Sequence, residues 1–372
     1  MKLAAKVKLS TTPEQSSALL DTLKRTNEIC NWISVEAWKS QAFKRFEIQK
    51  SCYHPAKLRL GLTAQVIALS IFRVADAYKL DKKVQRTFRP TGSIAYDDRI
   101  LRWHVEQGFV SIWSTAGRLR IPFVGGERQL EQLRTRRGES DLMLQDGEFY
   151  LVATCDVETE PIVAATEFLG VDLGIANIAT DSDGNRYSGA EVKSVRYRQR
   201  RLRKKLQKKV TTSANRRLKK LAGKEARFAR HTNHVISKQI VATAKGTGRG
   251  ISVEQLSGIR ERVKVRHGQR VVLHSWAFLQ LKSFIIYKAA LAGVLVVQVD
   301  PRNSSRECFH CGHIDKANRR SQSKFSCQRC GHTAHADLNA ARVLSGRASV
   351  NTPNAAASTS GRPAKPPASA VG

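Results

Sequence analysis

Two pairs of cysteines in the last quarter of the chain constrain its folding more than any other feature. Cys308 and Cys311 form one C-x-x-C pair, Cys327 and Cys330 form a second, and fifteen residues lie between the pairs. Each pair can present two thiolates to one cation, so together they make a four-sulfur site of the kind that binds zinc tetrahedrally. Four protein ligands leave no open coordination position. We therefore predict a structural zinc ribbon over residues 303–334.

Three histidines close to these pairs are alternative zinc ligands: His310, His313 and His332. With four cysteines available, we expect an all-thiolate site and assign the histidines to the surface or to contacts with nucleic acid. The first fifteen residues have no long apolar core, so we expect no export signal. In such a chain, paired C-x-x-C motifs indicate metal binding rather than disulfides.

The charge of the chain indicates a polyanionic partner. Its 372 residues include 64 Lys and Arg against 31 Asp and Glu, which gives a net charge of +33. Such an excess favours nucleic acid over a membrane surface. The longest apolar-rich stretch, residues 60–72, has 13 residues, whereas a spanning helix needs about 18 or more. We expect no membrane contact and a cytoplasmic protein.

The hydrophobic pattern of the first half predicts a β-barrel with a helical insertion. Apolar and basic residues alternate over residues 2–9, as in a half-buried strand. Apolar residues then recur at helical spacing over residues 11–80, and short β-favouring runs follow up to residue 165. We predict that residues 1–10 and 81–165 form one small wedge-like barrel, into which the helical segment 11–80 is inserted.

The segment 186–230 predicts a basic helical hairpin. It contains eighteen Lys and Arg and two acidic residues, whereas an ordinary solvated helix face would mix both signs. We expect helices over residues 186–245 and contacts with phosphates. The candidate nucleic-acid-binding residues are Arg200, Arg201, Arg203, Lys204, Lys205, Lys208, Lys209, Arg216 and Arg217.

Three acidic residues have settings that suggest a catalytic metal site. Asp172 lies within an apolar strand, Glu254 ends another apolar strand, and Asp337 begins a helix. Alone, Glu254 could be a surface residue, and Asp337 could simply favour the helix dipole. Asp172 is costly to bury unless it binds a cation or is paired. Together the three could hold two Mg²⁺ ions and a scissile phosphate.

These motifs resemble those of the transposon-encoded TnpB (OrfB) family, relatives of the type V CRISPR nucleases. Residues 170–175 (GVDLGI) resemble the first RuvC motif and residues 251–256 (ISVEQL) the second. The cysteine pairs and residues 336–341 (ADLNAA) resemble the zinc ribbon and the third motif. The similarity is specific over about residues 168–344 and is architectural only over residues 1–165.

The resemblance implies an α/β, RNase H-like RuvC nuclease domain over residues 166–345 with a zinc ribbon insertion. It implies that Asp172, Glu254 and Asp337 are the catalytic, magnesium-binding acids and that the protein is a prokaryotic DNA endonuclease. The implied partners are a guide RNA from the transposon end and double-stranded DNA cut beside a short adjacent motif, with the transposase of the same element as a further partner. Base pairing would supply the sequence specificity. His335 stands where many relatives have an acid, and we expect it to cap the helix or face solvent.

Other functions stay open at this point. Within the family, a nuclease-silent RNA-guided repressor would lose acids of the triad, and this chain has all three. A zinc-ribbon nucleic-acid-binding factor with incidental acids is the alternative from another class. A miniature CRISPR effector is also open, because a protein sequence does not show whether a repeat array lies nearby. Residues 346–372 are rich in Ala, Ser, Pro and Gly, and we expect a disordered tail there.

Overall fold

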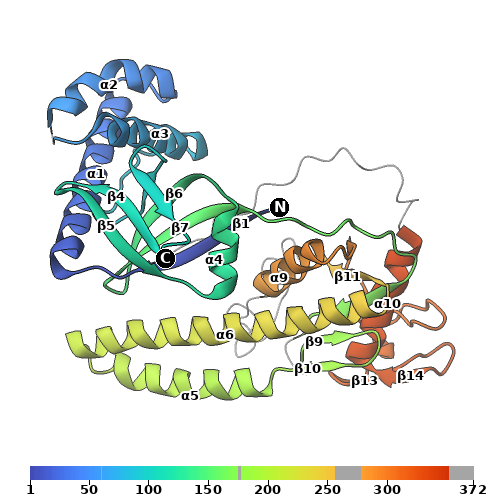
Figure 1. Ribbon diagram of the computed structural model, residues 1–372. Helices are drawn as coiled ribbons and strands as arrows, with labels where there is room; N and C mark the ends of the chain where they lie inside the picture. The colour runs from blue at the N-terminus through green and yellow to red at the C-terminus, as the bar shows by residue number, and fades with distance from the viewer. Residues whose placement is uncertain (60, 175–176, 256–277, 352–372) are drawn as a thin grey trace. The chain divides into compact units, whose positions relative to one another are not determined.

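The computed structural model describes residues 1–59, 61–174, 177–255 and 278–351, which belong to two compact units (Figure 1). The first unit runs from Met1 to Glu158, and the second begins at Thr159. Among the described helices, none is both long and apolar enough to cross a membrane.

The first unit contains one seven-stranded sheet in the order β2-β6-β7-β1-β5-β4-β3. Its two ends approach each other, because the indole Nε1 of Trp103 on β3 donates to Ser140 Oγ on β6 at 3.2 Å. The predicted small barrel is therefore present as a nearly closed sheet. Its strands are β1 (Lys2–Leu9), β2 (Ile94–Tyr96), β3 (Leu101–His104), β4 (Phe109–Ser114), β5 (Gly117–Val124), β6 (Arg136–Gln145) and β7 (Glu148–Asp156).

The amino-terminal strand joins this sheet between two strands that are distant in sequence. β1 pairs antiparallel with β7 from Lys2↔Asp156 to Lys8↔Tyr150, and with β5 at Lys8↔Val124 and Leu9↔Phe123. Its alternating pattern buries Ala5, Val7 and Leu9, since successive strand residues face opposite sides.

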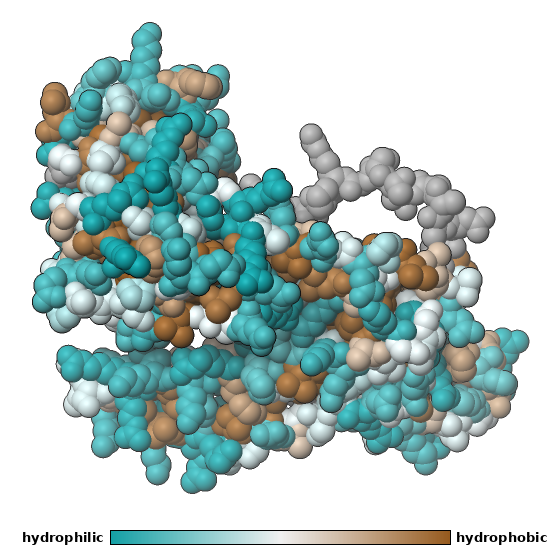
Figure 2. Space-filling view, viewed as in Figure 1, coloured by the Kyte–Doolittle hydropathy of each residue, from teal (hydrophilic) through white to brown (hydrophobic). Residues whose placement is uncertain are grey.

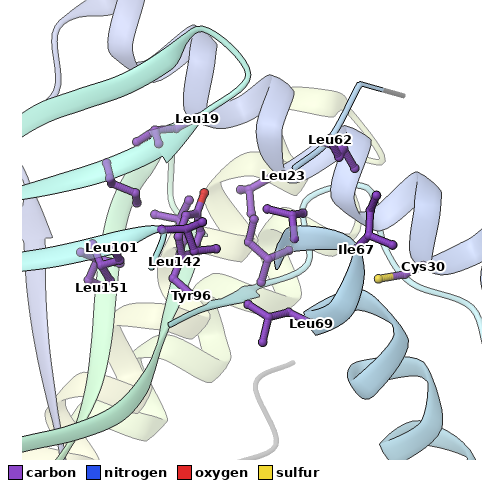
Figure 3. Close-up of a cluster of buried hydrophobic side chains, with 14 of the residues drawn as sticks. Leu19, Leu23, Cys30, Leu62, Ile67, Leu69, Tyr96, Leu101, Leu142 and Leu151 are labelled. Atoms are coloured by element: carbon purple, nitrogen blue, oxygen red, sulfur yellow. The ribbon is translucent and has the colours of Figure 1, made fainter. Parts of the chain in front are cut away.

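Three helices are inserted between β1 and β2, as the sequence predicts: α1 (Pro13–Lys39), α2 (Arg45–Arg59) and α3 (Ala64–Leu80). α1 begins with the expected capping box, in which Thr12 Oγ1 accepts from Gln15 N at 3.3 Å and Gln15 Oε1 accepts from Thr12 N at 3.1 Å. Helices and sheet share one core, where Leu19, Leu23 and Ile67 are buried together with Tyr96 and Leu151 (Figure 3).

Sequence patterns missed three elements of this unit: β2, β6 and the short helix α4 (Glu127–Arg134). β6 reads RRGESDLMLQ, so only its second half shows apolar residues. β6 is nevertheless a strand because it pairs with β7, in which buried residues alternate with more exposed ones.

The second unit is built on a five-stranded sheet in the order β10-β9-β8-β11-β12. β9 and β10 run antiparallel to their neighbours, whereas β8, β11 and β12 are parallel. The strands are β8 (Phe168–Asp172), β9 (Asn177–Asp181), β10 (Arg186–Ser188), β11 (Gly250–Glu254) and β12 (Val296–Val299).

Within the described residues, four helices accompany this sheet: α5 (Ala190–Gln207), α6 (Thr212–Gly246), α9 (Phe278–Leu291) and α10 (Ala336–Asn351). α5 and α6 form the predicted basic hairpin, but its helices begin at Ala190 and not at residue 186, because residues 186–188 pair with β9 as strand β10. The carboxyl-terminal half of α6 packs on α9. A small two-stranded sheet, β13 (Lys324–Ser326) with β14 (Thr333–His335), and a 3-10 helix η1 (Lys316–Asn318) lie between β12 and α10. The sequence pattern also predicts a strand over residues 250–256, a basic loop that extends to residue 270 and a helix over residues 275–292. The end of this strand, the loop and the start of this helix lie outside the described residues.

The predicted start of the disordered tail at residue 346 is wrong. α10 continues to Asn351, so residues 346–351 are helical and not part of a disordered segment. The reason is packing, because Leu344 and Ala348 are fully buried with Phe168 of β8 and Val299 of β12. Alanine carries too weak a hydrophobic signal to reveal this contact in the sequence.

Candidate active site and metal centre

The four ribbon cysteines converge on one point. The Sγ atoms of Cys308 and Cys330 are 3.7 Å apart, and those of Cys311 and Cys327 are 3.6 Å apart. All four sulfurs lie within 4.8 Å of one another. This donor set fits a tetrahedral zinc ion, because four thiolates at about 2.3 Å from a common centre require such sulfur–sulfur distances.

The two cysteine pairs adopt the same backbone geometry. In the first, Cys308 N donates to His313 O at 2.9 Å and Gly312 N donates to Cys308 O at 2.8 Å. In the second, the Cys327 amide and carbonyl make the corresponding bonds. Gly312 and Gly331 have φ of +71° and +73°, a conformation that L residues rarely adopt. The glycines after each pair are therefore needed to turn the chain.

The ribbon is fastened to α10 by a buried asparagine. Asn339 Oδ1 accepts from Phe309 N at 3.1 Å, and its Nδ2 donates to Glu307 O at 2.7 Å. Asn339 has no exposed surface, and it lies two residues after Asp337 on the same helix. The ribbon thus fixes the start of α10, where the third candidate acid stands.

Two of the candidate acids meet at the carboxyl ends of adjacent parallel strands. The register Ser252↔Gly170 and Val253↔Val171 brings Glu254 of β11 beside Asp172 of β8. The two carboxyl groups are close enough for each to affect the ionisation of the other. Glu254 is buried and Asp172 half-buried.

Asp337 reaches this pair because α10 packs unusually close to the sheet. A Cβ atom added to Gly170 would lie 1.9 Å from Ala341 O and 2.7 Å from Ser345 N, both on α10. Ser252 Oγ donates to Leu344 O at 2.8 Å, which ties the same helix to β11. The absence of a side chain at Gly170, two residues before Asp172, therefore allows α10 to approach the sheet so closely.

Burial and the charge of a neighbouring acid raise the pKa of each member of the pair. Desolvation, and then the charge of Asp337, raise the pKa of Asp172 to about 6, against smaller opposing contributions from Glu254 and Arg319. Desolvation and Asp172 raise the pKa of Glu254 well above its usual value, and Lys282 and Arg347 oppose this shift. Clustered acids that resist losing their protons are typical of functional sites.

Three polar residues close to the acids were not identified as part of the site from the sequence. Arg319, from the ribbon, lies 3.6 Å from Asp337 Oδ1, and Asn177 Nδ2 donates to Asp337 Oδ2 at 3.1 Å. Lys282 on α9 is buried and acts electrostatically on Glu254. His335 Nδ1 accepts from Asp337 N at 3.3 Å, which is the capping contact expected for it.

The spacing of the acids differs from that of the cysteines. Within the described part of the chain, we find one group of at least three potential metal ligands whose ligand atoms all lie within 4.8 Å of one another, and it consists of the four cysteine thiols. The three carboxylates are therefore more widely spaced than that, although Asp172 interacts with both others. They form an acidic cluster around Asp172 and not a closed ligand cage.

The basic hairpin presents most of its predicted contact residues to solvent. Eight of the nine candidates are exposed, and the hairpin surface in Figure 2 is mainly hydrophilic. Arg203 differs, because its Nη2 lies 2.6 Å from Glu225 Oε2 on α6. Arg203 therefore joins the two helices of the hairpin.

Two parts of the chain are similar to described protein families. Residues 152–258 match the family model described as "Probable transposase", and residues 278–344 match the model described as "Cas12f1-like, TNB domain". Among curated proteins, the chain is 35% identical over 214 residues to the CRISPR-associated endodeoxyribonuclease Cas12f1 of Sulfoacidibacillus thermotolerans, covering 53% of this chain and 49% of that protein. It is 31% identical over 172 residues to the TnpB-like protein MJ0751 of Methanocaldococcus jannaschii, covering 43% and 61% respectively.

A solved structure titled "Cryo-EM structure of the Cas12f1-sgRNA-target DNA complex" shares the fold. Its TM-score is 0.64 at 16% sequence identity, and the match covers 90% of this chain and 83% of that chain. The sequence matches are shorter, since this chain spans about half the length of several curated relatives.

Proposed function

Because this chain is related to the TnpB proteins and to the Cas12f nucleases, we propose that it is an RNA-guided DNA endonuclease. In this proposal it hydrolyses phosphodiester bonds beside a short adjacent motif, and Asp172, Glu254 and Asp337 are its catalytic carboxylates. The second unit is its RNase H-like nuclease domain, which the sheet order and the mixed strand directions support.

The observation that carries the proposal is the contact between Asp172 and Glu254. One carboxyl group is buried and the other half-buried, and burial together with neighbouring negative charge raises the pKa of both, with Asp337 contributing to the shift of Asp172. In a chain of net charge +33, such a cluster works against phosphate binding unless cations occupy it.

The donor set of this cluster fits magnesium. Carboxylate oxygens are the ligands of hard divalent cations, and Mg²⁺ is usually held by one or two carboxylates together with substrate phosphates. Two bound ions would activate water and stabilise the leaving oxygen. Among the residues of the chain, Asn177 and Arg319 hold Asp337 in place, and Lys282 stabilises the charged form of Glu254.

The remaining parts of the chain supply the nucleic-acid contacts in this proposal. The exposed cations of the α5–α6 hairpin contact the phosphate backbone of a guide RNA and its DNA hybrid. The barrel and helices of the first unit hold the RNA and read the adjacent motif on double-stranded DNA. Zinc at the four cysteines is structural. The transposase of the same element is a proposed partner, and the cytoplasm is the proposed location.

Substitution of Asp172 tests the catalytic assignment. Asp172→Ala is expected to abolish DNA cleavage and to leave guide-RNA binding within a few-fold of the parent protein. Glu167→Ala is a matched control, because Glu167 is an exposed acid that immediately precedes β8, the strand that ends at Asp172. Undiminished cleavage by Asp172→Ala would refute the assignment.

The RNA partner needs a separate experiment. The protein is purified from cells that carry its native locus, and the RNA that accompanies it is sequenced. A discrete RNA that ends at the transposon boundary is the expected result. Such an RNA without DNA cleavage by the parent protein would instead support the nuclease-silent, RNA-guided repressor.

A further inference from the structure

Phe309 is an exposed aromatic residue on an otherwise compact zinc ribbon. It lies between Cys308 and Cys311, and 47% of its surface is exposed, whereas Cys308 is buried. Phe325, the other phenylalanine of the ribbon, has no exposed surface. The ring is therefore accessible to a ligand.

The backbone beneath this ring is held firmly. Phe309 N donates to Asn339 Oδ1, and Asn339 is itself fixed by its bond to Glu307 O. Because Asn339 is fully buried, the backbone at Phe309 is held against α10. The point from which the ring projects is therefore fixed relative to that helix.

A cation lies beside the ring. The guanidinium carbon of Arg342 is 5.7 Å from the centroid of Phe309, within the range of a cation–π interaction. Arg342 is itself oriented by a bond from its Nε to Ser182 O at 3.4 Å. A ring that has an arginine at one side and solvent at another is the arrangement with which proteins stack single-stranded bases.

The charge of the ribbon favours a nucleic acid as the occupant. Residues 303–334 include six Lys and Arg and two acids. One of these acids, Glu307, is paired with Arg347, and the other, Asp315, caps η1 through Ala317 N. A nucleic-acid strand supplies both phosphates for these cations and bases that can stack on the ring.

The position of the ring relative to the acids indicates which strand it would bind. Asn339 contacts the Phe309 amide and lies two residues after Asp337, so the ring and this acid are attached to the same turn of α10. A base stacked on the ring would therefore belong to the strand that enters the acidic cluster.

We propose that Phe309, together with Arg342, stacks an unpaired base of the DNA strand next to the bond that is cleaved. This inference rests on the proposed function, because it takes a single DNA strand as the substrate of the site. Phe309 is then a substrate-contacting residue that holds the strand and takes no part in proton transfer.

A fluorescence experiment tests the stacking. The full chain carrying Asp172→Ala, which prevents cleavage, is titrated with short single-stranded DNA that contains one 2-aminopurine, whose emission falls on stacking. Phe309→Ala and Phe309→Leu are expected to weaken binding roughly tenfold and to reduce the quenching, since one stacked base contributes an effect of about this size. Phe309→Trp is expected to bind as the parent does.

Two controls separate stacking from other effects. Ile314→Ala removes another exposed apolar side chain of the ribbon, 50% exposed, and should change nothing. Zinc content, measured by elemental analysis, should stay the same in all variants, which shows that the ribbon is folded. Binding by Phe309→Leu equal to that of the parent would overturn the proposal, as would an equal loss with Ile314→Ala.

The result is independent of whether the chain cleaves DNA. The same Phe309 substitutions are placed in the chain with Asp172 intact, and guided cleavage is measured. If the parent cleaves and the Phe309 variants bind the probe normally, stacking is refuted and the nuclease function stands. If the parent does not cleave but the binding series behaves as expected, the proposed function fails and the stacking stands.

Discussion

Replacing Gly170 with alanine is expected to damage the site without unfolding the protein. The new Cβ would lie 1.9 Å from Ala341 O, whereas ordinary contacts of this kind begin at 3.4 Å. α10 must therefore move by about the difference, 1.5 Å, since the atoms it would strike belong to backbone and not to a flexible side chain. Asp337 lies at the start of that helix and moves with it.

The magnitude follows from two effects of different size. Inserting a methyl group into a packed interior typically costs about 1–3 kcal/mol of stability. Misplacing a reacting group by about 1 Å can lower a rate by about 10²-fold. We therefore expect a modest fall in melting temperature and a fall in DNA cleavage on the order of 100-fold.

The assay is single-turnover cleavage of target DNA by saturating protein with its guide RNA, at a temperature well below the melting transition. Guide-RNA binding and zinc content are measured on the same preparations and should match the parent. The matched control is Gly346→Ala, because Gly346 belongs to the same helix and a Cβ there meets nothing within 4 Å. Cleavage by Gly170→Ala within about threefold of the parent would refute the link between helix packing and the acids.

Three further predictions concern charge and metal. Because the pKa of Asp172 in the folded protein is about 6 rather than 3.8, the magnesium-free protein should lose stability as pH rises from about 4 to 6. Asp172→Asn should therefore raise the free energy of unfolding at pH 7.5 by an amount on the order of 3 kcal/mol, measured by urea unfolding. At pH 4 the variant should be no more stable than the parent. Replacing Cys308 and Cys311 with serine should release zinc and abolish cleavage, because the ribbon positions α10, whereas Cys155→Ala should keep one zinc per chain; retained zinc in the double variant would contradict the ribbon. Neutralising Lys204, Lys205, Lys208 and Lys209 should weaken RNA binding and lower its logarithmic salt slope by up to about 3, and an unchanged slope would mean that these residues are only a solvated face.

Local patterns in the sequence predict a large part of this fold. The alternation over Lys2–Leu9 and the capping residues Thr12 and Gln15 act within a few positions, so their structural meaning can be read directly. The cysteine pairs also act locally, since each pair and its glycine form one turn. The helical insertion and the basic hairpin follow from periodicity for the same reason.

Contacts between distant residues could not be predicted in the same way. Arg203 has the same sequence setting as its basic neighbours, and its pairing with Glu225 depends on how α5 and α6 pack. Arg319 and Lys282 resemble ordinary surface cations until the ribbon and α9 bring them to the acids. Resemblance to a family marks the acids and the cysteines, and these three cations are not among them.

The acids themselves show why sequence and structure are both needed. The sequence shows that an acid lies within an apolar strand. The free-energy cost of burying its charge, however, depends on the groups that surround it in the fold. The register of β8 and β11 brings Glu254 to Asp172, and a missing side chain at Gly170 admits the helix that carries Asp337. The close packing therefore raises the electrostatic cost of the cluster, and this cost supports the proposal that the three acids bind a cation in function.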